Sequence, residues 1–160
     1  MKFRSVDEFD TFQFKDATVS SIKFTENQLI IEAEGVIVKS DNSNNTRFED
    51  MYCVLLELKL NQFKLFQFVE QGYKYYDVSG KLLDVVPDRP LDHDEQTSVL
   101  EAAAGAYLFR LEKSVDTEGY ELIFDIEGKE DDELTKTYQI NFDFNGSIAS
   151  WDRFSGPVNG

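Results

Sequence analysis

Apolar and polar residues alternate along most of this chain with a period of two, which is the pattern of a β-strand that buries one face. The clearest case runs from Met51 to Leu60, where Val54, Leu56, Leu58 and Leu60 share one face. The same pattern predicts further strands over 12–24, 28–39, 63–69, 106–113, 120–128, 134–144 and 147–154. Because strands do not alternate with helices, we expect antiparallel rather than parallel pairing.

Short polar segments between these strands predict where the chain turns. Thr25–Asn27 separates the first two strands, since Asn tolerates the left-handed conformation of tight turns. Asn145-Gly146 is the strongest hairpin signal, because a type I′ turn needs positive φ at both central positions. Asn61-Gln62 is expected to reverse the chain, and one continuous strand through Asn61 is the alternative. The Asn-rich segment 40–46 predicts a plain mobile loop.

Only one segment predicts a helix. Asp92 followed by Glu95 has the form of an N-terminal capping box. Gly105 stands where a C-terminal stop belongs. We therefore expect a helix at about 93–104. The apolar stripe of this helix is narrow and consists of Val99, Leu100 and Ala103. The helix would therefore cover one end or face of a sheet.

One stretch of the chain has an echo in the second half. Gln28–Gly35 resembles Glu121–Gly128, 93 positions later, and the strands that end at Leu60 and Phe144 align 84 positions apart. The second half would then have a loop nine residues shorter, and the extra length of the first half would lie in its Asn-rich segment. Two interpretations stay open: an internal duplication, or chance similarity between strands that draw on few residue types.

These patterns predict a mainly β fold, all-β or α+β, in which antiparallel meanders form a sandwich or a barrel-like sheet with one short helix. A chain of 160 residues fits a single domain, 1–160. Within it, residues 12–86 and 106–154 would form two similar meanders joined by the helix-containing connection. A domain of this size buries about two-thirds of its unfolded surface, so it needs no disulfide or metal for stability.

The charge balance narrows the function classes. The chain has 31 acidic and 16 basic residues and a net charge of −15, which repels phosphate backbones and anionic membrane surfaces. We therefore expect neither nucleic acid nor membrane as a partner, whereas a basic protein is permitted. The N-terminus has no apolar run of signal-peptide length, and no stretch approaches the length of a spanning helix, so we expect a cytoplasmic protein.

Motifs that would indicate catalysis or a cofactor are weak. His93 is the only histidine and Cys53 the only cysteine, and Cys53 has the surroundings of a buried thiol. The acidic run around His93 is better explained by the helix cap than by metal binding, because consecutive residues do not converge on one ion. The loop 40–46 lacks the central Gly of an EF-hand. With no Gly-rich phosphate loop, we predict no cofactor, no metal and no catalytic residue.

The densest group of acids lies between Ser114 and Glu133, which holds nine acids and one lysine. If the turn 116–119, the outward positions of the following strand and the loop 130–133 are contiguous, they form one negative face. Such a face would dock a basic protein, or would serve solubility alone. The candidate partner-binding residues are Asp116, Glu118, Glu121, Asp125, Glu127, Glu130, Asp131, Asp132 and Glu133.

A second candidate surface is a tyrosine-rich hairpin. Ser79-Gly80 predicts a turn between strands 73–78 and 81–86. The first of these strands carries Tyr73, Tyr75 and Tyr76, and tyrosine is enriched in interfaces as well as in cores. The same strand could pair with a second copy of the chain, but the sequence does not specify an oligomeric state.

Three functional hypotheses follow. The leading one is a non-enzymatic, acidic protein-binding domain; by analogy of size and charge alone, one form of it is a bacterial immunity-type inhibitor of a basic toxin. An alternative is a β-barrel or sandwich that binds a small apolar ligand in a Phe-lined interior. A second alternative is a carboxylate-based hydrolase, although any fold with this many acids brings two of them close together.

Overall fold

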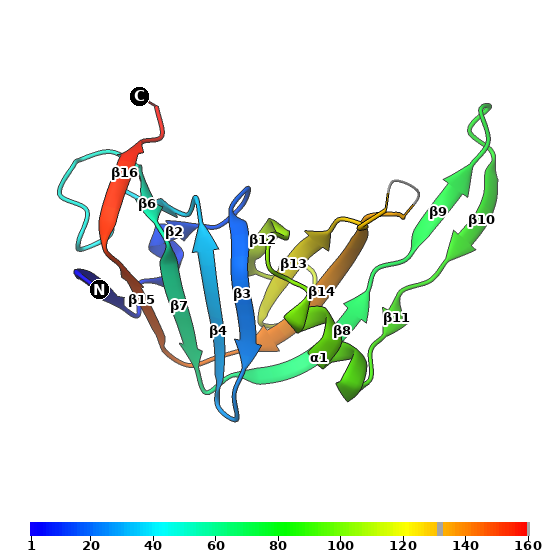
Figure 1. Ribbon diagram of the computed structural model, residues 1–160, viewed down its shortest axis with the longest axis horizontal. Coiled ribbons are helices and arrows are strands. Elements are labelled where there is room, and N and C mark those ends of the chain that lie inside the picture. The colour runs from blue at the N-terminus through cyan, green and yellow to red at the C-terminus, as the bar shows by residue number, and fades with distance from the viewer. Residues whose placement is uncertain (131–132, 160) are drawn as a thin grey trace.

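The computed structural model describes residues 1–130 and 133–159 and is built mainly from antiparallel β-sheet (Figure 1). The main sheet has ten strands, and every pair of neighbours in it is antiparallel. In spatial order they are β1 (Phe3–Val6), β15 (Ser147–Trp151), β7 (Leu56–Asn61), β4 (Gln28–Glu34), β3 (Thr18–Phe24), β12 (Tyr107–Lys113), β13 (Tyr120–Ile126), β14 (Lys136–Asp143), β8 (Lys64–Glu70) and β11 (Arg89–Pro90). In the described part of the chain this sheet does not close into a barrel, so the mainly β, sandwich-like prediction is confirmed.

A second, four-stranded sheet forms because several long strands break and continue in another sheet. Its spatial order is β16 (Arg153–Pro157), β6 (Met51–Val54), β5 (Ile37–Val38) and β2 (Phe12–Gln13), and a short 3-10 helix, η1 (Phe9–Thr11), precedes β2. The predicted single strand 51–60 is wrong at Leu55, whose φ of 31° separates β6 from β7. The predicted strands 28–39 and 12–24 are likewise interrupted, at residues 35–36 and 14–17. Corners of this kind let a strand move between packed sheets.

The main sheet is pseudo-symmetric: counted outward from its centre, the strands on one side follow the same order as their equivalents on the other side. β3, β4 and β7 on one side of the centre correspond to β12, β13 and β14 on the other, and β15 corresponds to β8. At the centre the backbone bonds come in a matched pair: Val19 N donates to Ala106 O, and Leu108 N donates to Ala17 O, both at 2.9 Å. The first strand of each half therefore meets the other with two-fold symmetry.

The two halves exchange a strand, which the sequence did not predict. After β7 the chain crosses over so that β8 pairs with β14, and after β14 it crosses back so that β15 pairs with β7. Neither Asn61-Gln62 nor Asn145-Gly146 is a hairpin turn. The two crossovers lie side by side instead: Asn61 N donates to Gly146 O and Asn145 N donates to Asn61 O, both at 2.8 Å. The segments 12–86 and 106–154 thus do not fold as separate meanders.

The echo between the halves is present in the structure with a shifted register. Each half has a bulge in its first strand, after Val19 and after Leu108. Val19 pairs with Ala33 and Leu108 pairs with Phe124, so Ala33 corresponds to a residue 91 positions later rather than 93. The same reasoning through the next ladder places β14 82 positions after β7 rather than 84. The two-residue slip leaves every side chain on its predicted face.

The apolar faces of both halves contribute to one core. The rings of Phe24 on β3 and Phe68 on the exchanged strand β8 lie 6.2 Å apart, and those of Phe63 and Phe142 lie 5.4 Å apart. On the side of the second sheet, the only tryptophan, Trp151, is fully buried with its ring 5.7 Å from that of Phe12. The core therefore joins the strands that exchange between the halves.

The helix α1 (His93–Glu101) forms where it is predicted but ends three residues earlier than expected. Its capping box is complete: the Asp92 carboxylate accepts a hydrogen bond from Glu95 N at 2.8 Å, and Asp92 N donates to the Glu95 carboxylate at 3.2 Å. Val99 and Leu100 pack against the core next to β3. The helix thus covers part of the core that the sheets leave open.

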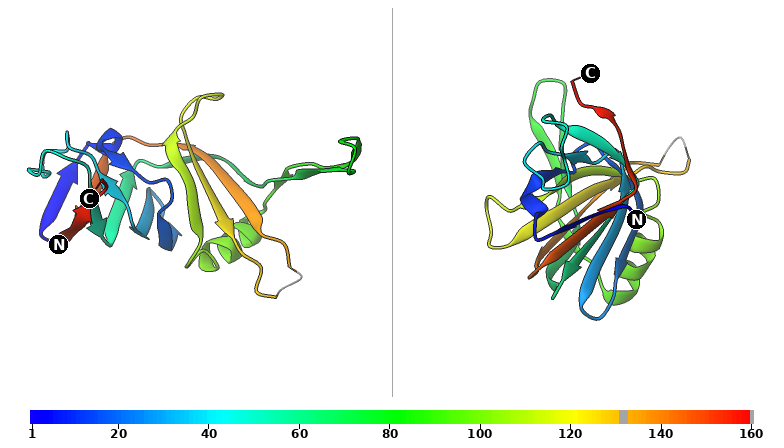
Figure 2. Two further views of the ribbon diagram at one scale, coloured as in Figure 1. Left: turned by 90° about the horizontal axis from the view of Figure 1, so that it is seen from above. Right: turned by 90° about the vertical axis from the view of Figure 1, so that its left-hand side faces the viewer.

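The tyrosine-rich hairpin is present and stands away from the rest of the molecule. It consists of β9 (Tyr73–Tyr76) and β10 (Leu82–Val86), which pair only with each other in the described structure. Figures 1 and 2 show it extending beyond β8 and β11. At its tip, the Asp77 carboxylate accepts hydrogen bonds from the backbone N–H groups of Ser79 and Lys81, both at 2.9 Å. We call residues 73–86 the arm.

Candidate functional site

The acidic residues that the sequence grouped together do not form one face. Asp116 and Glu118 lie in the turn between β12 and β13, whereas Glu127, Glu130 and Glu133 lie in the loop between β13 and β14. These connections are at opposite ends of β13, and Figure 2 shows them extending in opposite directions. Two further candidates, Asp131 and Asp132, lie outside the described residues.

Both carboxylates on the strand between the two acidic ends are held by contacts within the sheet, and one of them, Glu121, is neutralised. Glu121 is only 7 % exposed, and Arg110 Nη1 donates to its Oε1 at 2.9 Å. This hydrogen bond is the main reason why the pKa of Arg110 is raised. Asp125 accepts a hydrogen bond from Thr137 Oγ1 at 2.7 Å. These carboxylates therefore stabilise the sheet rather than extend an open negative strand.

The strand that follows the loop 127–133 lies next to the base of the arm. β14 begins at Lys136, shortly after this loop, and Gln71 N donates to Thr137 O at 2.8 Å just before the arm starts. Glu70 is 3.7 Å from Lys136 Nζ and accepts a 3.4 Å hydrogen bond from the Tyr138 hydroxyl. These contacts place the start of β14, which the acidic loop precedes, at the base of the arm.

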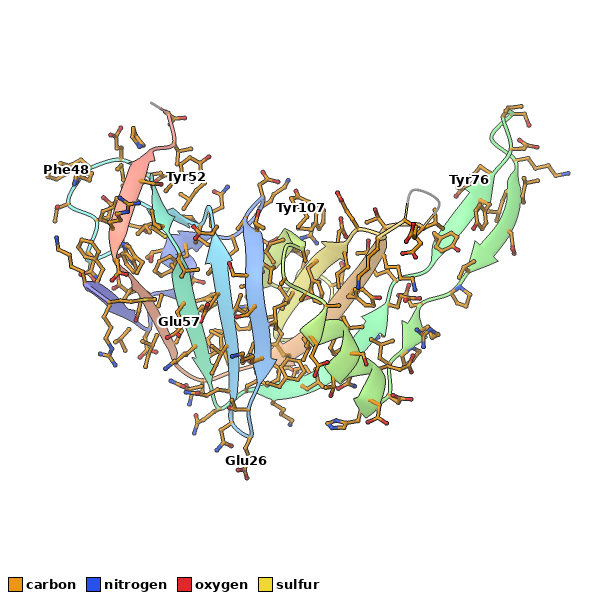
Figure 3. The ribbon with its side chains drawn as sticks, viewed as in Figure 1. Glu26, Phe48, Tyr52, Glu57, Tyr76 and Tyr107 are labelled. Carbon is orange, nitrogen blue, oxygen red and sulfur yellow. The ribbon has the colours of Figure 1, made fainter. Side chains whose placement is uncertain are left out.

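The arm carries an unusual amount of exposed apolar surface. Both of its strands are exposed along nearly their whole length, and Tyr76 projects from it in Figure 3. The Tyr73 and Tyr75 rings pack edge to face with their centroids 4.9 Å apart. Seven large apolar side chains of the arm are exposed: Tyr73, Tyr75, Tyr76, Val78, Leu82, Leu83 and Val85.

The sequence identified the three tyrosines of the arm but missed its aliphatic residues. The missed signal is the segment 82–86, Leu-Leu-Asp-Val-Val, whose apolar side chains fall on both faces of a strand. A strand with two apolar faces is ordinarily buried on both sides. In this hairpin neither face is covered, which is why the arm differs from every other strand pair of the described structure.

The Asn-rich loop, expected to be mobile, is held by buried side chains. Asn45 is 6 % exposed, and its Nδ2 donates to three carbonyl oxygens, of Val38, Lys39 and Glu49, at 2.9–3.2 Å. Asn42 Nδ2 donates to Thr11 Oγ1 at 2.8 Å. The loop therefore fastens the second sheet to η1 and serves the fold.

The side chains considered for catalysis show no arrangement for it. His93 is exposed at the start of α1. Cys53 is buried, and burial, with a smaller contribution from Glu34, raises its pKa to about 12, so the thiolate is suppressed at neutral pH. Within residues 1–130 and 133–159, no group of three or more His, Cys, Asp or Glu side chains could hold a metal ion.

Most phenylalanines fill the core rather than line a central cavity. One cleft of about 520 Å³ does open beside β12 and is lined by four phenylalanines and six charged residues. No helix in the described structure is long and apolar enough to cross a membrane.

Comparisons with protein-family models, with curated protein sequences and with solved structures found no match to this chain.

Proposed function

We propose that this chain is a non-enzymatic protein-binding domain that holds a basic partner between the arm and the acidic loop 127–133. The observation that carries the proposal is the arm itself, a two-stranded hairpin that presents seven large apolar side chains outside the core. Two-stranded hairpins are marginally stable in water on their own. Contiguous exposed apolar surface of this kind marks interaction sites.

The apolar surface of the arm would supply the binding energy. Tyr76 and Leu83 are 57 % and 64 % exposed, and Val78 at the tip is fully exposed. Burying a half-exposed side chain of this size stabilises a complex by about 1 kcal/mol. Several such side chains together would outweigh the loss of conformational freedom at the contact.

The charge of the surroundings selects the partner. The arm is neutral, with Lys74 and Lys81 balanced by Asp77 and Asp84, while the loop 127–133 carries a net charge of −4 in its sequence. A second copy of the chain would bring another net charge of −15 and would be repelled at low salt. A basic protein with an apolar patch is favoured on both grounds, and its association would be fast and salt-dependent.

A narrower form of the proposal is an inhibitor of a basic toxin such as a nuclease. Its support is the small size of the chain and its net charge of −15. In this form the arm would insert into a cleft of the toxin, and the acidic loop would contact the cationic surface around that cleft.

The test uses immobilised full-length chain to capture proteins at low salt, followed by calorimetry of the captured protein with purified variants. The arm variant is Tyr76→Ser/Leu83→Ser. Its control is Phe48→Ser/Val115→Ser, which removes two apolar side chains outside the arm that are more exposed than Tyr76 and Leu83. We expect a basic protein whose affinity falls at least tenfold with the arm variant and less than twofold with the control.

A second pair of variants tests the charge. Glu127→Gln/Glu130→Gln/Glu133→Gln neutralises the acidic loop, and Glu26→Gln/Asp41→Asn/Glu101→Gln neutralises three exposed acids elsewhere. The loop variant should weaken binding at low salt much more than its control. Retention of no basic protein, or equal binding by both variants of each pair, would refute the proposal.

A further inference from the structure

The cleft of about 520 Å³ lies where the two halves of the main sheet separate. The ladder between β3 and β12 is short: its one register pair is Thr18 and Tyr107, and its backbone hydrogen bonds join residues 16–19 to residues 105–108. Beyond Tyr107, the edge of β12 from Phe109 to Lys113 has no strand partner on that side within the described residues. The segment 9–15 lies opposite this edge, and the cleft opens between the two.

The base of the cleft is aromatic. Phe9, Phe12 and Phe14 come from η1, β2 and the residue after it, and all three are buried side chains of the core. Phe109 lies at the bulge of β12 and is more exposed, at 37 %. Its ring lies 5.8 Å from Lys15 Nζ, within the distance of a cation–π interaction. A flat apolar group would find aromatic surface here.

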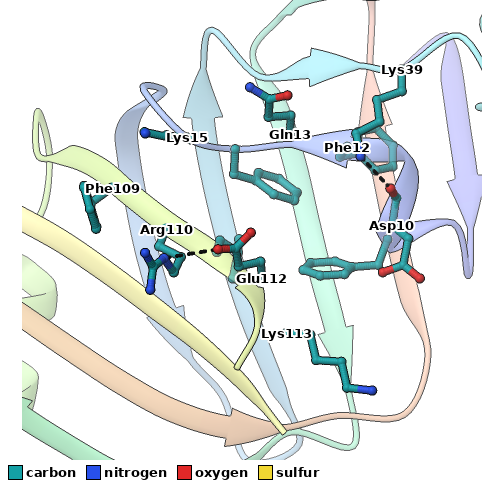
Figure 4. Close-up of a pocket in the computed structure, with 12 residues that line it drawn as sticks. Asp10, Phe12, Gln13, Lys15, Lys39, Phe109, Arg110, Glu112 and Lys113 are labelled. Carbon is teal, nitrogen blue, oxygen red and sulfur yellow. Dashed lines mark hydrogen bonds and ion pairs between the residues drawn. The ribbon is translucent and has the colours of Figure 1, made fainter. Parts of the chain in front are cut away.

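The rim of the cleft is basic although the chain is strongly acidic. Arg110 is already compensated, because it bonds to Glu112 at 3.1 Å and to Glu121 at 2.9 Å. The remaining charge comes from three lysines and one aspartate, and Figure 4 shows the lysines on different sides of the cleft. The charged lining residues are Asp10, Lys15, Lys39, Arg110, Glu112 and Lys113.

This local excess of positive charge is informative because basic residues are scarce. Four of the chain's 16 basic residues line this one cleft, while two of its 31 acids do. Lys39 also donates to the backbone oxygen of Asp10 at 3.2 Å, which fixes one side of the rim. Lys15 and Lys113 are exposed, and their flexible side chains can turn toward a bound anion.

We propose that this cleft binds a small organic anion, a phosphate monoester or a carboxylic acid that carries a flat aromatic group. The anionic end would contact the lysines, and the ring would lie against Phe109 and the aromatic base. The volume lies within the range of small-molecule sites in proteins. The site does not depend on the proposed protein partner, because the arm and the loop 127–133 contribute no residue to it.

The test is a titration of the full-length chain with phenyl phosphate, with inorganic phosphate, benzoate and phenol in parallel. Binding is followed by ¹H–¹⁵N NMR and by the fluorescence of Trp151, whose ring contacts that of the lining residue Phe12. We expect phenyl phosphate and benzoate to shift the amide signals of residues 9–15 and 109–113. Phenyl phosphate and benzoate should bind at least fivefold more tightly than inorganic phosphate or phenol. Inorganic phosphate has no aromatic ring to contact Phe109, and phenol has no anionic group to contact the lysines.

Two double variants with the same change in net charge test which lysines bind the anion. Lys15→Gln/Lys113→Gln removes two rim cations, and Lys23→Gln/Lys129→Gln changes the net charge equally outside the cleft. The first pair should weaken phenyl phosphate binding at least tenfold and the second less than twofold. All four side chains are exposed, so folding should be preserved. The proposal is overturned if phenyl phosphate binds no better than phenol or inorganic phosphate, or if both variants lose affinity equally.

Discussion

The turn between β12 and β13 offers a sharp test of the packing between strands. Gly119 has a φ of +87°, and a Cβ added there would lie 2.5 Å from the carbonyl oxygen of Phe142 and 3.2 Å from Cε2 of Phe66. Gly105 has almost the same φ, +86°, but a Cβ there would meet no atom within 4 Å. Alanine at the two positions therefore imposes the same backbone strain with and without a steric clash.

The expected magnitudes follow from this comparison. A left-handed conformation costs an L-residue about 1–2 kcal/mol, and this applies to both variants. At Gly119 the backbone of β14 must also shift, which costs about 1–3 kcal/mol by analogy with overpacked cores. We expect Gly105→Ala to lower the free energy of unfolding by about 1 kcal/mol and Gly119→Ala by about 3 kcal/mol. In a chain of this length these losses correspond to a Tm lower by about 3 °C and about 10 °C.

Urea denaturation of the wild type and both variants, followed by Trp151 fluorescence, measures the difference. The dependence on urea should keep its slope, because the folded state is expected to bury the same surface. If the two variants lose the same stability to within about 0.5 kcal/mol, the close approach of β14 to Gly119 is wrong. Inorganic salt should not alter the result, since no charge changes.

Two further predictions concern buried polar groups. Asn45→Ala leaves three backbone carbonyls without their donor, so the free energy of unfolding in urea should fall by about 2 kcal/mol. The control Asn44→Ala removes a single side-chain donor and should cost less than half as much. Equal losses would contradict the anchoring role of Asn45. Because burial raises the pKa of Cys53 to about 12, this thiol stabilises the fold fully below its ordinary pKa near 9, and this contribution is lost as the pH rises toward 12. At pH 8 the native protein should not react with Ellman's reagent, and the urea-unfolded protein should react at once; rapid labelling of the native protein would contradict the buried position.

The local elements of this fold follow from the sequence because their causes are local. Period-two alternation marks the strands, as at Leu56, Leu58 and Leu60, whose side chains are all buried. The Asp92 and Glu95 pair predicts the start of α1, because a cap is completed within four residues. The acidic composition likewise follows from residue counts alone.

Strand pairing was decided by the tertiary structure. Asn145-Gly146 has hairpin chemistry, but a turn signal specifies only that the chain can bend there. β15 pairs with β7 and β14 with β8, so the bend becomes a crossover between the halves. Alternation also cannot detect a slip of two residues, since such a slip keeps each side chain on the same face. The offset of 93 inferred from Gln28–Gly35 therefore differs from the structural offset of 91 without disturbing the core.

The candidate surfaces likewise depend partly on the sequence and partly on the tertiary structure. The sequence determined which residues are acidic or aromatic, but it treated Glu121 as outward because the neighbouring strand was unknown. Arg110, on the paired strand β12, neutralises this carboxylate. The segment 81–86 was predicted as one strand of a hairpin, and only the structure shows that this hairpin lies outside the core. Composition and periodicity are properties of single segments, whereas exposure and charge compensation depend on which segments meet, and only the tertiary structure decides that.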